Sequence, residues 1–174
     1  LTLVLRRAKH LAQSGSEIFA TPALSRFLNN DFDKKSFIST PNIIDSFCEL
    51  DDSDIFSAMK AWRHHSDRVL SSLSARLLDR KLFRIELRPH PFTTEEVNEK
   101  INLIAAKWSL SIDEASYFVS NQSIENKAYT PNGILIKYKD GTTRDFAESN
   151  DHLSLELLTK PVKKSFLCYP KDLE

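Results

Sequence analysis

The feature that most constrains this chain is a change in hydrophobic periodicity at Phe83. In residues 69–78 apolar side chains recur every three or four positions, which is the spacing of one buried helix face. In residues 83–88 apolar side chains alternate with charged ones, which is the spacing of a strand with one buried face. We therefore expect a mainly helical segment over 1–82, followed by a lobe that contains strands, with Ile85 and Leu87 facing a core.

The second half mixes both patterns. Thr93 to Glu96 forms a capping box that predicts the start of a helix. Asp140-Gly141 predicts a hairpin between strands at 134–139 and 143–146, and 165–169 reads as a last strand. The stretch 150–161 fits a short helix or an alternating strand, and its period does not decide between them. The whole predicts an α+β fold, with a smaller α+β lobe over 83–174 that holds an antiparallel sheet.

Capping residues predict where several helices begin. Thr21-Pro22 and Thr40-Pro41 each place a threonine at the cap and a proline at the first helical position. Ser66 is the expected cap of the helix over 69–78. The acidic cluster Asp51 to Asp54 allows a helix cap or a metal site, and the cap is favoured because the glycine and distal glutamate of a calcium loop are missing.

Charge and length exclude several classes of protein. Twenty-four basic residues balance twenty-four acidic ones, so the chain carries no basic excess of the kind that nucleic-acid binding requires. No apolar run approaches the roughly 18 residues of a membrane span, and the opening apolar stretch at 1–5 is too short and too soon followed by charge to resemble a signal peptide. We expect a cytoplasmic location. The first residues already resemble the middle of an amphipathic helix, so we also expect a fragment of a longer protein.

No catalytic or metal site is predicted from motifs. Three scattered glycines cannot form a phosphate-binding loop, and the signatures of common hydrolases are absent. The adjacent His64 and His65 point to different sides of a helix, so we interpret them as a polar helix end. A small independent hydrolase that uses Cys168 or a histidine pair is a remaining, less favoured hypothesis.

Basic residues gather where the helix over 69–78 gives way to the strand. Arg76 and Arg80 are one helical turn apart, Lys81 follows, and Arg84 and Arg88 share one face of the strand. Arginine binds phosphate oxygens in pairs and stays charged, so this group suits a polyphosphate. The alternative is a solvated charged surface with local ion pairs, and the residues alone leave both open.

The run FCELDDSDIFSAMKAWRHHSDRVLSSLSARLLDRKLFRIEL, at 47–87, resembles a known family. It is similar to the region downstream of the catalytic core in HD-domain phosphohydrolases of the deoxynucleoside triphosphate triphosphohydrolase group. The resemblance implies a C-terminal region without the catalytic motifs, since the chain has no His-Asp dipeptide. It implies an inactive fragment that needs no cofactor itself, from a parent enzyme that uses a divalent metal and whose catalytic motifs precede Leu1.

The resemblance also implies a regulatory site and partners. In family members with an allosteric nucleotide site, an Arg-x-Leu-x-Lys run contacts the activating nucleotide, and it matches Arg80, Leu82 and Arg84, with arginine in place of the lysine. A further basic contact on the last strand of the family falls near Tyr169, where the cation is lost. We expect a regulatory and oligomerisation region whose partners are its own missing HD core, other copies and a nucleotide. The alternative is a purely structural oligomerisation module without ligand.

Overall fold

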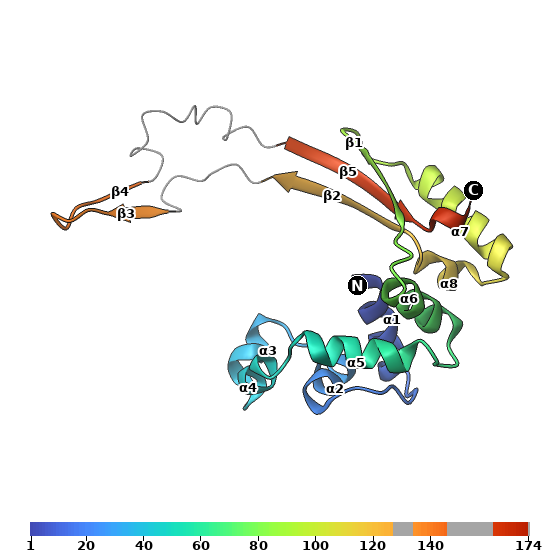
Figure 1. The fold of residues 1–174 in the computed structure, drawn as a ribbon, viewed down its shortest axis with the longest axis horizontal. Coiled ribbons are helices and arrows are strands. Elements are labelled where there is room, and N and C mark those ends of the chain that lie inside the picture. Colours follow the sequence, from blue (N-terminus) through green and yellow to red (C-terminus); the bar gives the residue numbers. More distant parts are fainter. Residues whose placement is uncertain (127–133, 146–161, 174) are drawn as a thin grey trace.

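The computed structural model describes residues 1–126, 134–145 and 162–173, and it confirms the α+β fold (Figure 1). The predicted helix or strand at 150–161 lies outside the described residues. The helices of the first half are α1 (Thr2–Gln13), α2 (Pro22–Asn29), α3 (Lys34–Ser39), α4 (Ile43–Cys48), α5 (Asp52–Trp62) and α6 (Arg68–Leu78). The later elements are β1 (Arg84–Arg88), α7 (Thr94–Trp108), α8 (Ile112–Ser116), β2 (Ser120–Asn126), β3 (Leu135–Lys137), β4 (Thr143–Asp145), β5 (Val162–Tyr169) and the short 3-10 helix η1 (Lys171–Leu173).

The strands form two antiparallel groups. β5 lies in the middle of a three-stranded sheet of order β1-β5-β2, with Ile85 opposite Cys168 and Leu87 opposite Phe166. β3 and β4 form the predicted hairpin, whose turn contains Gly141 at a φ of 85°, a value that glycine adopts without strain. Figure 1 shows this hairpin beyond the end of the three-stranded sheet, away from the helices.

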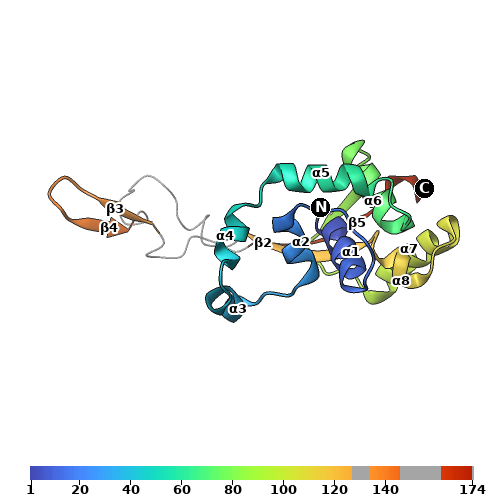
Figure 2. The same cartoon turned by 90° about the horizontal axis from the view of Figure 1, so that it is seen from below.

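One hydrophobic core joins the helices to the sheet. α6 packs against α5 and α1, and α1 packs against α2 (Figure 2). Trp62 is 1% exposed and anchors α5 by donating its indole N–H to the Phe19 carbonyl at 2.8 Å. The sheet contributes its own buried side chains to the same cluster, chiefly Leu167 and Tyr169. The helical segment and the sheet thus share apolar contacts across the position where the periodicity changes.

The prediction that Ile85 and Leu87 face the core is wrong. Each is 59% exposed, whereas Leu167 and Tyr169 on the opposite face of the sheet are buried. The physical reason is that α7 covers that opposite face, where Lys100 lies 4.8 Å from the centre of the Tyr169 ring. The alternation was identified correctly, but the side that became buried depends on where the helix packs.

Two of the predicted helix caps also need correction. Thr40 closes α3 instead of opening a helix, and α4 begins only after Asn42, which adopts a left-handed conformation with a φ of 57°. The cap of α6 is Asp67, not Ser66, because the Asp67 carboxylate accepts the Leu70 N–H at 2.7 Å. The acidic cluster behaves as a cap, as predicted, with a reciprocal pair of hydrogen bonds between Asp51 and Asp54.

Candidate phosphate-binding site

The end of α6 holds Arg80 in an unusual backbone conformation. The Lys81 N–H bonds to the Arg76 carbonyl at 2.8 Å and the Arg80 N–H bonds to the Leu77 carbonyl at 3.2 Å, which is the paired closure of a Schellman motif. Arg80 has a φ of 55°, at a position that glycine usually occupies. A residue with a Cβ therefore occupies this left-handed position, although the conformation costs free energy for any residue but glycine.

A cavity of about 430 Å³ opens beside this turn. It is lined by four cations and one carboxylate, together with one apolar side chain: Arg76, Arg80, Lys81, Lys171, Asp172 and Leu82. The site thus combines the end of α6 with η1 at the end of the described chain. Positive charge exceeds negative charge around it, which favours an anionic ligand.

One of these cations is already paired. The Arg76 guanidinium donates two hydrogen bonds to the Asp172 carboxylate, at 3.0 and 2.7 Å, and it lies 4.8 Å from the centre of the Trp108 ring. The hydrogen bond from Arg76 is the main cause that lowers the pKa of Asp172 below its ordinary value. Lys107 donates to the Asp172 carbonyl and holds η1 against α7. This network fixes η1, and with it Lys171, at the cavity.

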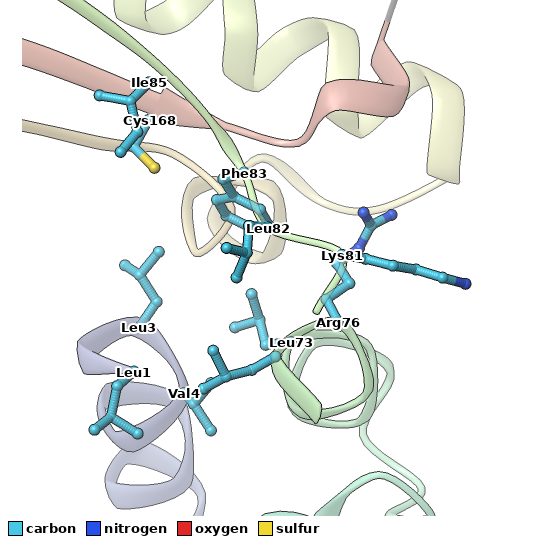
Figure 3. Close-up of a pocket in the computed structure, with 11 residues that line it drawn as sticks. Leu1, Leu3, Val4, Leu73, Arg76, Lys81, Leu82, Phe83, Ile85 and Cys168 are labelled. Atoms are coloured by element: carbon cyan, nitrogen blue, oxygen red, sulfur yellow. The ribbon is translucent and has the colours of Figure 1, made fainter. Parts of the chain in front are cut away.

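The remaining cations of the cavity are available for a ligand. Within the described ranges, Arg80, Lys81 and Lys171 form no ion pair, and all three are exposed. Figure 3 draws the neighbouring apolar pocket, and there Arg76 and Lys81 are directed to one side, away from Leu1 and Leu3. Three unpaired cations around one concave surface suit the oxygens of a phosphate chain.

The predicted site residues are only partly brought together. Arg80 and Leu82 line the cavity, and Leu82 is 57% exposed. Arg84 does not line it; it is the first residue of β1, two positions after Leu82, and is paired in register with Tyr169. Burial and the hydrogen bond to Glu86 raise the pKa of Tyr169, and the contact with Arg84 lowers it.

Lys171 and Asp172 are site residues that sequence reasoning missed. They lie more than ninety positions after Arg76, and the Arg76–Asp172 pair spans 96 residues. No local spacing connects them, since only the packing of η1 on α7 brings them to the end of α6. The family resemblance placed a basic contact near Tyr169, and Lys171 supplies a cation two positions later.

His64 and His65 follow the end of α5, as predicted for a polar helix end. The Nδ1 atom of His65 accepts the Asp67 N–H at 2.9 Å, so the imidazole helps to shape the turn into α6. Asp67 also receives two hydrogen bonds from Arg7, at 3.1 and 2.6 Å. Burial tends to raise the pKa of Asp67, but the bonds from Arg7 and Leu70 outweigh it, and the pKa lies below its usual value.

Other kinds of site find little support in the part of the chain that is described. No group of three or more histidine, cysteine, aspartate or glutamate side chains is placed to hold a metal ion there. Burial raises the pKa of the Cys168 thiol, which disfavours the reactive thiolate. None of the described helices combines the length and apolar character needed to cross a bilayer.

Comparison with solved structures identifies a similar protein. Over 97% of its length the chain is similar to a phosphohydrolase from Bacteroides thetaiotaomicron, with 42% sequence identity and a TM-score of 0.81. No family model and no curated protein sequence matched. The similarity covers 42% of that phosphohydrolase. In sequence and fold, the chain is therefore similar to less than half of a phosphohydrolase.

Proposed function

We propose that this chain is the C-terminal regulatory and assembly region of an HD-type, metal-dependent phosphohydrolase that acts on nucleotides in the intact protein. In this proposal residues 1–82 continue the helical core of the enzyme, and 83–174 form its C-terminal lobe. Two findings support it: the similarity to part of a phosphohydrolase, and the cationic cavity at the end of α6. The cavity is the observation that carries the regulatory role.

In the proposed site the effector's phosphates lie against the cations of the cavity. Arg80 offers a forked pair of donors, while Lys81 and Lys171 supply point charges. Leu82 packs beside the nucleoside part of the ligand. Arg84 begins β1 outside the cavity, so it reaches the effector only if the ligand extends past Leu82. The left-handed backbone of Arg80 fits this role, because strained residues often persist where function needs their side chain.

Replacing Arg80 should change nucleotide binding and stability in opposite directions. Arg80→Gly removes the cation and relieves the left-handed strain, so we expect the free energy of unfolding to rise by about 0.5 kcal/mol. The same variant should bind dGTP or GTP about tenfold more weakly, since one charge-assisted contact is lost. Isothermal calorimetry on this chain and nucleotide activation of the intact enzyme are the two measurements.

Lys60→Ala is the matched control, because Lys60 is an exposed cation on α5 that does not line the cavity. It should leave nucleotide binding unchanged. Unaltered binding and activation in Arg80→Gly and Arg80→Ala would sink the regulatory role.

The second candidate is a purely structural oligomerisation module whose basic residues form ion pairs between subunits. The exposed apolar residues of β1 favour it, since such side chains commonly mark protein interfaces. Light scattering with and without nucleotide distinguishes the two. Assembly that ignores nucleotide favours the structural module, whereas assembly driven by nucleotide favours the regulatory region.

A further inference from the structure

An apolar cavity lies next to the cationic cavity, with α1 and α6 on one side and β1 and β5 on the other (Figure 3). Its volume is about 300 Å³, at the lower end of the range for small-molecule sites. Its walls are largely apolar and include Leu3, Val4, Leu73, Phe83, Ile85 and Cys168. Val4 and Leu73 are buried at its floor, whereas Ile85 is 59% exposed. A hydrocarbon group placed here would cover apolar surface that the chain leaves in contact with water.

The apolar cavity and the cationic cavity adjoin each other at the end of α6. Both are lined by Arg76, Lys81 and Leu82. Figure 3 shows the Lys81 side chain directed away from Leu3, so its ammonium group lies at the end of the cavity that is far from α1. A lysine in this position borders apolar surface with its methylene groups and keeps its charge outside. The two cavities therefore offer a hydrocarbon-binding part and an anion-binding part side by side.

The chemistry of the apolar cavity favours a hydrocarbon chain over a nucleobase. Apart from Arg76 and Lys81, its lining side chains are apolar, with the Cys168 thiol as a weakly polar exception. The Arg76 guanidinium already donates to Asp172. A base buried here would leave most of its donors and acceptors unpaired, which costs binding free energy. A hydrocarbon chain has no such groups, and its burial is favourable.

We propose that the two cavities together bind an amphiphilic anion, a single hydrocarbon chain of medium length that carries a phosphate head. The hydrocarbon chain lies between Val4 and Ile85. The phosphate lies against Arg80, Lys81 and Lys171. Charge complementarity fixes this orientation, because these three cations gather at one end of the combined space. The inference does not require that the effector of the intact enzyme be a nucleotide.

A series of alkyl phosphates tests the proposal. Isothermal calorimetry on this chain compares inorganic, butyl, hexyl, octyl and dodecyl phosphate, each below its micelle concentration. We expect the affinity to rise about fourfold per methylene and to level off once the hydrocarbon fills the cavity. Equal affinities for inorganic and hexyl phosphate would overturn the proposal. A gain that continues unchanged to dodecyl phosphate would overturn it too, because it would show adsorption to a surface without a size limit.

The titrations contain no nucleotide, so they measure the apolar cavity separately from the regulatory role proposed above. A chain that binds alkyl phosphates with the expected dependence on length and ignores dGTP and GTP would support this inference and contradict the nucleotide site. A chain that binds the nucleotides but gains nothing from the hydrocarbon would do the reverse.

Ile85→Ser tests the wall of the cavity, and Leu87→Ser is its matched control. Leu87 lies on the same strand and is also 59% exposed, but it does not line the cavity. We expect Ile85→Ser to bind hexyl phosphate about fivefold more weakly and inorganic phosphate as the parent does. Leu87→Ser should leave both affinities unchanged. Circular dichroism checks that both variants fold, and equal effects of the two substitutions would contradict the proposed position of the hydrocarbon.

Lys81→Gln tests the head group. The substitution removes the charge and keeps most of the side chain that borders the apolar cavity. We expect it to weaken binding of every alkyl phosphate by about tenfold, while the gain per methylene stays the same. An unchanged affinity for hexyl phosphate would show that the phosphate lies elsewhere and would overturn the proposed orientation.

The two cysteines provide a readout that needs no substitution. Cys168 lines the cavity and is partly buried, whereas Cys48 on α4 is exposed and does not line it. Saturating hexyl phosphate should slow the alkylation of Cys168 and leave that of Cys48 unchanged. Alkylation of Cys168 at the same rate with and without hexyl phosphate would overturn the proposal.

Two further measurements exclude other occupants of the cavity. Leu1 lines the cavity, so residues that precede it in a longer protein are candidates for the same space. Binding of hexyl phosphate by this chain, with none by the intact enzyme, would overturn the proposal in favour of those residues. Sedimentation of the chain with vesicles that contain phosphatidic acid, without binding of soluble hexyl phosphate, would overturn it in favour of a membrane surface.

Discussion

The two faces of the β1-β5-β2 sheet differ in burial, and the sequence pattern of the strands does not predict which face is buried. On the covered face Leu167 is 1% exposed and Tyr169 is 2% exposed, beneath α7. On the open face Ile85 and Leu87 are 59% exposed, although they are the apolar members of β1. The difference teaches that the central strand decides burial: β5 places Ser165, Leu167 and Tyr169 on the buried face, and the register of β1 with β5 leaves Ile85 and Leu87 on the other face.

Because of this register, the charged residues of β1 lie on the face covered by α7, where they bind the helix and β5. Arg88 donates to both Glu96 oxygens, at 2.7 and 2.5 Å, and Tyr169 donates its hydroxyl to Glu86. The guanidinium of Arg88 also lies 3.8 Å from the centre of the Phe92 ring. These contacts tie the edge strand to the helix and to β5. The polar face of β1 is thus the face that holds the lobe together.

Truncating one leucine on each face gives the largest expected contrast. Leu167→Ala should lower the free energy of unfolding by about 3 kcal/mol, because it leaves a cavity in the core. Leu87→Ala should change it by less than about 0.5 kcal/mol in the monomer, since the side chain is already in water. Urea unfolding at low protein concentration measures both. Equal losses in the two variants would mean that the open face is covered within a single molecule.

Removing the Tyr169 hydroxyl should have a smaller effect. Tyr169→Phe loses the hydrogen bond to Glu86, and we expect a loss of about 1 kcal/mol at neutral pH. Burial, followed by the bond to Glu86, raises the pKa of Tyr169 above its ordinary value of 10. The stabilisation from neutral Tyr169 is therefore complete below about pH 10 and declines as pH rises through the native pKa.

Thermal unfolding between neutral and alkaline pH compares the parent with Tyr169→Phe. The parent should lose more stability above about pH 10 than the variant does. Parallel curves for the two proteins would contradict a buried, neutral Tyr169.

The smallest expected effect concerns Glu96, the acceptor for Arg88. The hydrogen bonds from Arg88, followed by the Thr93 N–H, lower the pKa of Glu96 to about 2. Since the native pKa is depressed, the contribution to stability is present above the ordinary carboxyl pKa and is lost as pH falls towards 2. Titration followed by NMR should show this pKa, and Arg88→Ala should return it towards the usual range. An unchanged Glu96 pKa in that variant would show that the ion pair is absent in solution.

Much of the fold was predictable because its signals are local. The helices α1, α2 and α7, the hairpin turn at Asp140-Gly141 and the strand ending at Tyr169 follow from periodicity, capping and turn residues that lie within a few positions of one another. The errors arose where neighbours in sequence offered two valid choices. Ser66 and Asp67 both suit a helix cap, and the shape of the turn selected Asp67 through its bonds to Leu70 and Arg7.

The candidate site divides in the same way. Arg80 and Leu82 follow from a local basic run and a family resemblance, and both line the cavity. Lys171 and Asp172 could not be predicted, because their position depends on η1 packing against α7. Arg84 was grouped with Arg80 by sequence distance, but the strand direction turns it towards Tyr169.

By itself, the sequence determined the class of fold, the change from helices to strands near Phe83 and the basic residues at that junction, because periodicity and charge are properties of neighbouring residues. Only the tertiary structure decided which face of the sheet is buried, which cations share a cavity and which apolar surfaces remain open. The physical reason is that a side chain becomes buried only when a second surface packs against it. The side chains of one strand are equally ready to face a helix, the solvent or a second molecule until packing selects among them.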